Sequence, residues 1–267
     1  MKCVKVNKNN VSFLISHTCH ETHDWWLNNY EAWEPFTFKV FDHYLTPKSV
    51  YIDLGTFTGH TILYAAQKVK SAYGIELDPM AYEACKKNVL TNNLKNVNLI
   101  NCAVANYDGE VGIKMDRIGT SGCGFDPQSS MKITCLTIES LLKVWGIKGC
   151  DFIKMDIEGS EEVCLPAMSE FLSKHTPDLL LSLHKHLGAK AETISNIKEL
   201  YNFVYNKDFK NVKDILEEVI NNKSHEHGEQ DYLFTNKPFD ININHILSRL
   251  ERIKFDIFEI EKEILKL

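Results

Sequence analysis

Residues 51–61 read YIDLGTFTGHT, and this stretch decides the fold. An apolar run over 50–54 leads into it, and the helix-like run TILYAAQKV follows from Thr61. The pattern predicts a strand in which Asp53 stands near the end, a sharp turn at Gly55, and a helix opened by Gly59. A helix N-terminus offers unpaired N–H groups and the positive end of the helix dipole, so the turn is a candidate ligand-binding loop.

An acidic residue follows at the distance expected for a nucleoside site. Glu76 lies 21 residues after Gly55, at the end of a second apolar run in GIELDP, where its carboxylate can accept hydrogen bonds from ribose hydroxyls. The loop lacks the middle glycine of a dinucleotide fingerprint, because Thr56 and Phe57 occupy that region. This disfavours a pyrophosphate and an NAD(P) dehydrogenase. A carboxylate at Asp53 suits a cationic amino-acid moiety, and S-adenosylmethionine combines an adenosine with an ammonium group.

The rest of the chain alternates strand-like and helix-like runs, which predicts an α/β fold around a mostly parallel sheet. The expected strands are 50–54, 71–77, 97–104, 150–157, 178–184 and 231–236. Helices are expected between them, with starts at Asp78-Pro79 and at Thr137 or Ser140, and a stop at Gly146. Two short strands, near 109–115 and 131–137, flank a Gly/Ser-rich loop at 118–130 that is a candidate lid.

Composition narrows the range of partners. The 267 residues carry 30 Lys+Arg against 36 Asp+Glu, and this acidic balance argues against a nucleic-acid partner. Apolar runs are too short to span a membrane or to form a signal peptide, so a cytoplasmic protein is expected. The eight cysteines contain no CxxC pair, so they are expected to be mostly buried free thiols rather than zinc ligands.

The two ends of the chain differ from the middle. HDWWLNNYEAWEPFTF (23–38) holds three of the four tryptophans, and forms either a lid packed on the core or a platform for stacking a sugar or adenine ring. From Ile243 to Leu267 apolar residues follow a strict heptad spacing, which favours a coiled coil and a homo-oligomer. The alternative for this tail is a surface helix lying on its own domain.

The sequence resembles class I S-adenosylmethionine-dependent methyltransferases, and DFIKMDIEGSE (151–161) narrows the resemblance to the FkbM family. It covers roughly residues 30–236 and includes WEPFT (33–37), NCAVANYDG (101–109) and LSLH (181–184). The resemblance implies a Rossmann-like, seven-stranded sheet whose last strand, here 231–236, runs antiparallel. It further implies an O-methyltransferase, since most members methylate oxygen, often on sugars, glycolipids or polyketides.

The resemblance also assigns roles to residues at the cofactor. Asp53, Gly55 and Gly59 are expected at the methionine end, Glu76 at the ribose, and the Ala103 backbone near the adenine. Glu34 is expected at the mouth of the active site. The full set of expected S-adenosylmethionine-binding residues is Glu34, Asp53, Gly55, Thr58, Gly59, Glu76, Ala103 and Asp156.

Three residues are expected to serve catalysis: Asp156, Glu158 and His184. A sugar hydroxyl needs its proton removed during transfer, and substrates of open α/β sheets bind at the carboxyl ends of strands. His184 ends the 178–184 strand and is the expected general base near neutral pH. Open alternatives are a helix-capping role for Glu158, a structural His184, and a divalent metal bound by Asp156, Glu158 and His184.

Three segments are therefore expected: an aromatic-rich cap (1–34), a methyltransferase domain (35–240) and a C-terminal helix (241–267). The expected activity is S-adenosylmethionine-dependent O-methylation of a sugar, a nucleotide sugar, or a glycan precursor of capsule or lipopolysaccharide type. The alternatives are an N-methyltransferase acting on a small amine and a non-catalytic, cofactor-binding partner subunit.

Overall fold

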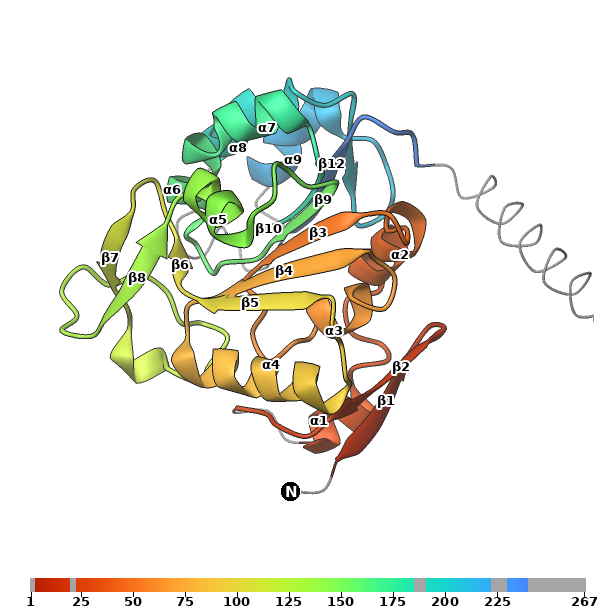
Figure 1. Cartoon of the computed structure of the whole chain (residues 1–267). Coiled ribbons are helices and arrows are strands. Elements are labelled where there is room, and N and C mark those ends of the chain that lie inside the picture. The colour runs from red at the N-terminus through yellow and green to blue at the C-terminus, as the bar shows by residue number, and fades with distance from the viewer. Residues whose placement is uncertain (1–2, 20–22, 185–190, 222–229, 240–267) are drawn as a thin grey trace, which may run out of the picture. The chain divides into compact units, whose positions relative to one another are not determined.

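A seven-stranded sheet forms the centre of the protein in the computed structural model (Figure 1). In sheet order the strands are β11 (Phe203–Asn206), β12 (Gln230–Thr235), β10 (Asp178–Leu183), β9 (Phe152–Met155), β3 (Val50–Leu54), β4 (Ser71–Glu76) and β5 (Val97–Asn101). Neighbours from β10 to β5 pair in parallel, and β12 is antiparallel to both β10 and β11. The expected mostly parallel sheet with an antiparallel last strand is confirmed, whereas β11 was not predicted.

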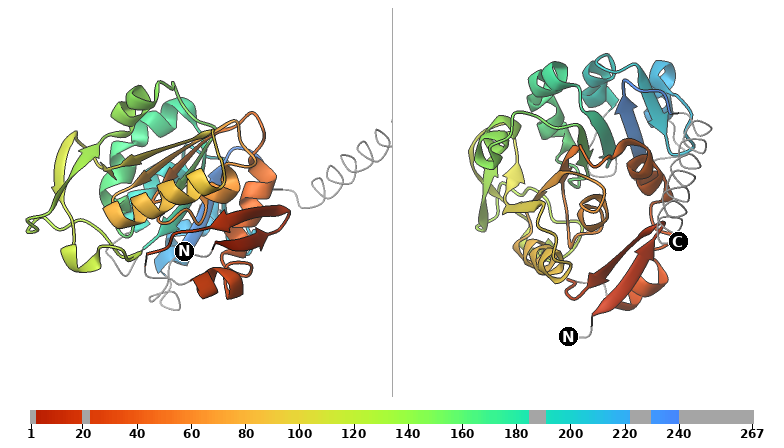
Figure 2. Two further views of the ribbon diagram at one scale, coloured as in Figure 1. Left: turned by 60° about the horizontal axis from the view of Figure 1, so that its bottom comes forward. Right: turned by 45° about the vertical axis from the view of Figure 1, so that its right-hand side comes forward.

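Helices cover both faces of this sheet (Figures 1 and 2). On one face lie α5 (Ile138–Trp145), α6 (Glu161–Ala167), α7 (Ser169–His175), α8 (Ala191–Lys198) and α9 (Leu216–Asn221), the last preceded by a 3-10 turn at Lys213–Ile215. On the other lie α2 (Pro35–Tyr44), α3 (Ile62–Ala65) and α4 (Pro79–Thr91). Successive side chains of β3 point to opposite faces of the sheet: Ile52 packs in the core under α5–α9, while Tyr51 packs on Phe41 of α2.

Local capping chemistry sets several helix boundaries as predicted. The Asp78 carboxylate accepts hydrogen bonds from the backbone N–H groups of Met80 and Ala81 at the start of α4. The Thr137 hydroxyl accepts from Ser140 at the start of α5, and Gly146 ends that helix at φ +68°. The helix-like run after Ser160 is instead two helices, because α6 contains Pro166 and the chain turns into α7 at Met168.

A second, smaller sheet corrects the predicted strand 97–104. That run divides into β5 and β6 (Ala103–Val104), and β6 leaves the main sheet to pair with β8 (Lys132–Leu136), which also pairs with β7 (Gly109–Gly112). Between β7 and β8 the chain forms a 3-10 turn at Met115–Arg117. The sheet therefore carries the 113–131 segment away from β5 and across the carboxyl ends of the central strands.

The N-terminal segment forms a hairpin that the sequence analysis missed. Strands β1 (Val4–Lys8) and β2 (Val11–Ile15) pair antiparallel across Asn9-Asn10, and α1 (His23–Asn28) follows them. The Asn88 side chain of α4 joins this segment to the core. It accepts from the backbone N–H groups of Ser16 and His17 and donates to the carbonyls of His17 and Thr58.

The structure describes residues 3–19, 23–184, 191–221 and 230–239. Residues Met1–Asn236 form one compact unit and Lys237–Leu267 a second, so the expected cap 1–34 belongs to the same unit as the central sheet. The heptad tail 241–267 and the self-association predicted from it lie outside the described residues. Among the residues that are described, no helix has the length and apolar character needed to cross a membrane.

Candidate active site

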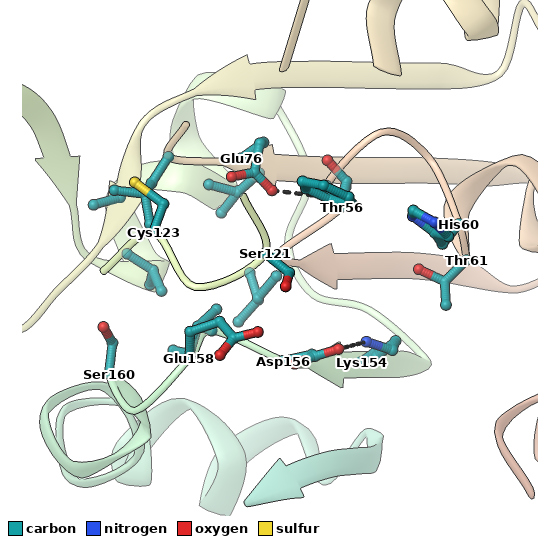
Figure 3. A pocket seen from close by; sticks show the side chains of 18 of the residues that line it. Thr56, His60, Thr61, Glu76, Ser121, Cys123, Lys154, Asp156, Glu158 and Ser160 are labelled. Carbon is teal, nitrogen blue, oxygen red and sulfur yellow. Dashed lines mark hydrogen bonds and ion pairs between the residues drawn. The ribbon is translucent and has the colours of Figure 1, made fainter. Parts of the chain in front are cut away.

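A cavity of about 440 Å³ opens at the carboxyl ends of β3, β4 and β9 (Figure 3). Its volume lies within the range of small-ligand sites. Leu54 and Gly55 line it from the end of β3, Glu76 from the end of β4, and Asp156 and Glu158 from the segment after β9. In Figure 3 Glu76 lies on one side of the cavity, opposite Asp156 and Glu158.

The turn after β3 requires glycine because of a close approach inside the protein. The backbone N–H groups of Gly55 and Thr56 both donate to the Ile75 carbonyl at 3.0 Å, which attaches the turn to β4. Gly55 has φ +91°, and a Cβ built on it would lie 1.9 Å from the Asp156 carbonyl oxygen. No other residue fits, so Gly55 brings the ends of β3 and β9 together and itself lines the cavity.

The helix after this turn starts later than predicted. Gly59 does not open it: Gly59 has φ +108° and lies within a turn, and α3 begins at Ile62. The extra residues form a longer loop in which Thr56, Phe57, His60 and Thr61 line the cavity. Gly59 and the fully buried Thr58 lie behind that surface and are not among the lining residues.

Glu76 is held by backbone N–H groups on both of its carboxylate oxygens. Oε2 accepts from Phe57 at 2.6 Å, and Oε1 accepts from Asp78 at 2.9 Å. Burial raises the pKa of Glu76 to about 7, although these two hydrogen bonds favour the charged form. Because each carboxylate oxygen has a second acceptor site, Glu76 can still receive hydroxyl donors from the cavity.

An apolar region adjoins Glu76. Leu77, Cys102, Ala103 and Val104 line this part of the cavity, and Phe125 lines it from the 113–131 segment. Ala103, which the resemblance assigns to the adenine, is therefore one of the lining residues. The region suits a flat, largely apolar group beside a carboxylate.

The predicted loop 118–130 is attached to the protein by several contacts. Lys114 N donates to the Gly124 carbonyl at 3.1 Å, and Asp126 N donates to the Gly112 carbonyl at 2.8 Å. The Gly119 backbone N–H also donates to the Asp78 carboxylate that caps α4. Thr120, Ser121 and Cys123 of this loop line the cavity, so the loop forms part of its wall in this structure.

Asp53, which was expected to hold the methionine end of the cofactor, is not among the residues that line the cavity. Its side chain is fully buried, the Thr61 hydroxyl donates to Oδ2 at 2.7 Å, and burial raises the pKa of Asp53 to about 6. Lys154, a residue of β9 that was not predicted, lines the cavity. Burial lowers the pKa of Lys154, but the carboxylates of Asp156, Glu34 and Asp53 outweigh this effect and hold the pKa above its ordinary value.

Part of the cavity wall is aromatic. Trp25 and Trp33 line it together with Glu34, while Trp26 is buried in the core. The tryptophan-rich stretch therefore packs on the core and also contributes rings to the cavity wall, and stacking of a sugar or adenine ring on it stays a prediction. His60 stacks between Trp26, at 4.3 Å between ring centroids, and Phe57, at 5.2 Å. Burial lowers the pKa of His60 to about 3, so its imidazole is neutral.

His184 joins a group of charged side chains that we call the charge cluster: Lys154, Asp156, Glu158, Glu161 and His184. His184 Nδ1 lies 2.9 Å from Glu161 Oε1, and Nε2 lies 3.5 Å from Asp156 Oδ1 and 3.7 Å from Glu158 Oε2. Lys154 Nζ donates to Asp156 Oδ2 at 2.7 Å. The three predicted catalytic residues are thus neighbours in space, and Glu161 is a fourth that was not predicted.

The protonation of this cluster differs from the predicted mechanism. Burial lowers the pKa of His184, but Glu161, Asp156 and Glu158 more than compensate and raise it to about 9. His184 therefore carries a proton near pH 7 and does not line the cavity, which disagrees with its expected role as a neutral base. Burial raises the pKa of Glu158 to about 7, and Glu158 does line the cavity. Glu158 is the better placed of the two to accept a proton.

The residues that sequence reasoning missed had weak local signals. Lys154 stands in the middle of a strand, where a lysine pointing to a buried carboxylate cannot be told from one pointing to solvent. Glu161 belongs to the run DFIKMDIEGSE, but its spacing suggested only the first turn of a helix. Trp25 and Trp33 were noted as a dense aromatic group, yet the pattern did not say which ring faces the cavity.

Comparison with known proteins places the chain in a family. The model of the FkbM methyltransferase domain matches residues 53–228. The protein belongs to the FkbM methyltransferase family. This agrees with the resemblance seen in the sequence, and the matched region includes the turn after β3, Glu76 and the charge cluster.

Individual relatives are more distant. The uncharacterized protein MJ1452 of Methanocaldococcus jannaschii is 33% identical over 82 residues, which is 31% of this chain and 31% of that protein, so the match spans about a third of the relative's length. The crystal structure of a methyltransferase FkbM from Methylobacillus flagellatus has a TM-score of 0.48 and 17% identity, covering 71% of this chain and 44% of that one. A tRNA (uracil-54, C5)-methyltransferase of Pyrococcus abyssi, crystallised with S-adenosyl-L-homocysteine, has a TM-score of 0.44 and 12% identity, covering 88% and 44%.

Proposed function

We propose that the protein is an S-adenosylmethionine-dependent methyltransferase that methylates a hydroxyl group of a sugar, a nucleotide sugar or another glycan precursor. Membership of the FkbM methyltransferase family supports methyl transfer. The observation that carries the proposal is one cavity with a buried carboxylate, Glu76, on one side and two further carboxylates, Asp156 and Glu158, on the other.

The Glu76 side of the cavity suits the nucleoside part of the cofactor. Ribose hydroxyls would donate to the Glu76 carboxylate, and the adenine would lie in the apolar region formed by Leu77, Ala103 and Phe125. Glu34 would bind the ammonium group and Lys154 the carboxylate of the methionine part. Both side chains line the cavity, and their opposite charges match the two charges of an amino acid.

The acceptor hydroxyl would approach Glu158. The oxygen attacks the methyl carbon, the bond between sulfur and carbon breaks with its electron pair staying on sulfur, and the hydroxyl proton passes to the Glu158 carboxylate. Because S-adenosylmethionine supplies an activated methyl group, the protein contributes orientation and a proton acceptor. His184 and Lys154, on either side of Asp156, would orient the acids rather than take the proton.

An N-methyltransferase is the second candidate, since a neutral amine attacks without a base. Replacement of Glu158 by Gln separates the two. O-methylation by the Glu158→Gln variant would fall by about 10²–10⁴-fold, whereas methylation of an amine would change little.

The first test is titration calorimetry with S-adenosylmethionine. We expect the wild type to bind the cofactor and Glu76→Ala to bind it about 10–100-fold more weakly, because charged hydrogen bonds to the ribose are lost. Glu83→Ala is the matched control, since Glu83 is an exposed carboxylate on α4 paired only with Lys86 among the described contacts. Absence of cofactor binding by the wild type would reject the proposal.

The second test addresses the acceptor. The wild type is incubated with isotopically labelled cofactor and panels of nucleotide sugars, sugars and small amines, and products are searched by mass spectrometry for the gain of one methyl group. Label appearing on a sugar hydroxyl supports the proposed acceptor class. Label on amines alone replaces it with N-methylation, and tight cofactor binding without turnover of any acceptor favours a non-catalytic partner subunit.

A further inference from the structure

Three potential metal ligands converge beside the cavity. Asp156, Glu158 and His184 each offer one ligand atom, and these three atoms lie within 4.8 Å of one another. His184 Nε2 faces Asp156 Oδ1 and Glu158 Oε2. The imidazole nitrogen is 3.5 Å from the first oxygen and 3.7 Å from the second, which is longer than an N–H···O hydrogen bond. Atoms separated in this way leave room for a small cation between them.

Two of these ligand atoms are oriented by partners behind them. A carboxylate oxygen of Glu161 can only accept, so Nδ1–H of His184 donates to it and Nε2 points toward Asp156 and Glu158. Lys154 donates a hydrogen bond to Oδ2 of Asp156, and the other oxygen of that carboxylate, Oδ1, faces His184 Nε2. A histidine that binds a metal through one ring nitrogen usually donates a hydrogen bond to a carboxylate from the other, which is how His184 and Glu161 are arranged.

The third ligand residue, Glu158, has an unusual backbone conformation. Glu158 has φ +53° and Gly159 has φ +90°, so two successive residues turn through the left-handed region directly after β9. A non-glycine residue rarely adopts this conformation, and such strain is concentrated at functional sites. Here it brings the Glu158 side chain, 23% exposed, alongside Asp156 on the cavity wall (Figure 3).

We propose that Asp156, Glu158 and His184 bind a divalent cation at the wall of the cavity. Two carboxylate oxygens and one neutral imidazole nitrogen suit Mn²⁺ or Fe²⁺, which accept both kinds of ligand. The cation would take the place of the proton on His184 Nε2, which is released to solvent on binding. His184 is 3% exposed whereas the two acids face the cavity, so the remaining coordination positions are open toward a bound molecule. Glu161 and Lys154 act as positioning residues.

The role of this cation in catalysis rests on the proposed function. An acceptor hydroxyl bound to the cation would be held at the methyl group, and its proton would be easier to remove. The acceptor oxygen forms a bond to the methyl carbon, the carbon–sulfur bond breaks with its electrons kept by sulfur, and the proton passes to the Glu158 oxygen that does not bind the cation. A second hydroxyl on a neighbouring carbon would fill another open position, which favours an acceptor with adjacent hydroxyl groups.

The alternative is a cluster held together only by ion pairs around a protonated His184. The two arrangements differ in whether the protein binds metal. We would titrate metal-free full-length protein with Mn²⁺ alone and follow the free ion by electron paramagnetic resonance. We expect one saturable site per chain, weakened by at least about 100-fold in Glu158→Gln and in Asp156→Asn.

Two variants keep the test specific. Glu170→Gln removes an exposed carboxylate from the first turn of α7 and should leave the Mn²⁺ affinity unchanged. Glu161 does not itself bind the cation, yet Glu161→Gln should weaken Mn²⁺ binding about 10–100-fold, because a neutral amide oxygen accepts a weaker hydrogen bond from His184 Nδ1–H. The circular dichroism spectrum should be unchanged. A purely structural Glu161 would change stability without changing the metal affinity of the folded protein.

Binding of S-adenosylmethionine, measured with a chelator present, separates this inference from the proposed function. Cofactor binding without saturable Mn²⁺ binding overturns the metal site and leaves methyl transfer standing. Equal Mn²⁺ affinity in the wild type and Glu158→Gln also overturns it. Saturable Mn²⁺ binding that depends on Glu158, without cofactor binding, supports the metal site and rejects the proposed function.

Discussion

The two sides of the cavity are built in different ways. On the side formed by β3 and β4, the turn 55–61 meets Glu76 through backbone groups: Gly55 and Thr56 donate to Ile75, and Phe57 donates to Glu76. On the other side, the charge cluster joins side chains of β9, α6 and the end of β10. The first side depends on how closely the backbone can approach, and the second on how buried charges balance.

This difference predicts how each side fails. On the backbone side, any side chain larger than that of Gly55 would clash with the neighbouring backbone, so a substitution there affects folding. On the charged side, Glu158 is partly exposed, and an isosteric replacement there keeps the shape of the side chain and removes only its charge. We therefore expect such a change to affect chemistry before folding.

Gly55→Ala should have the largest effect. The added Cβ would meet the Asp156 carbonyl at 1.9 Å, and the residue would have to keep φ +91°, so we expect a loss of more than about 4 kcal/mol in the free energy of unfolding. Gly146→Ala is the control, because Gly146 has φ +68° but open space around its Cβ, and should cost about 1–2 kcal/mol. Urea denaturation measures both, and similar losses in the two variants would contradict the argument from close approach.

Measuring both kcat and the Kd of S-adenosylmethionine for Glu158→Gln and for Glu76→Ala should show that the two sides of the cavity have different functions. We expect Glu158→Gln to lower kcat by about 10²–10⁴-fold while the Kd of S-adenosylmethionine changes little. Glu76→Ala should instead weaken the cofactor about 10–100-fold and keep kcat within a few-fold at saturating cofactor. If both variants lowered cofactor affinity equally, the division of the cavity into a cofactor side and a chemical side would be wrong.

The smallest expected effect is the pH dependence of stability at Glu76. Its pKa is raised to about 7 in the folded protein from an ordinary value of 4.5, so its contribution is fully present below about pH 4.5 and is lost as the pH rises through 7. Relative to Glu76→Gln, the cofactor-free wild type should therefore lose about 2 kcal/mol between pH 5.5 and pH 8.

Urea denaturation of both proteins at several pH values measures this difference. Glu83→Gln serves as the control, since an exposed carboxylate should show no such trend between pH 5.5 and pH 8. A wild type that gains stability relative to Glu76→Gln over this range would show that the two backbone hydrogen bonds outweigh the burial of the carboxylate.

Local chemistry explains which features were predictable. The apolar run of β3, the aspartate cap of α4 and the threonine cap of α5 each depend on residues within a few positions, and each was found. The Asn9-Asn10 hairpin also had a local signal, an alternating pattern on both sides of a two-residue turn, but it was overlooked. Glu76 was placed correctly because one strand–helix–strand unit determines its position.

The sequence by itself determined the type of sheet, the turn at Gly55, the position of Glu76 and the acids after β9, since hydrophobic pattern and capping act over short distances. Only the tertiary structure decided that Asp53 is covered by Thr61, that Lys154 orients Asp156, and that His184 is held by Glu161, 23 residues away. Burial and the sum of nearby charges set the protonation of these groups. Both depend on residues that meet only after the strands have assembled.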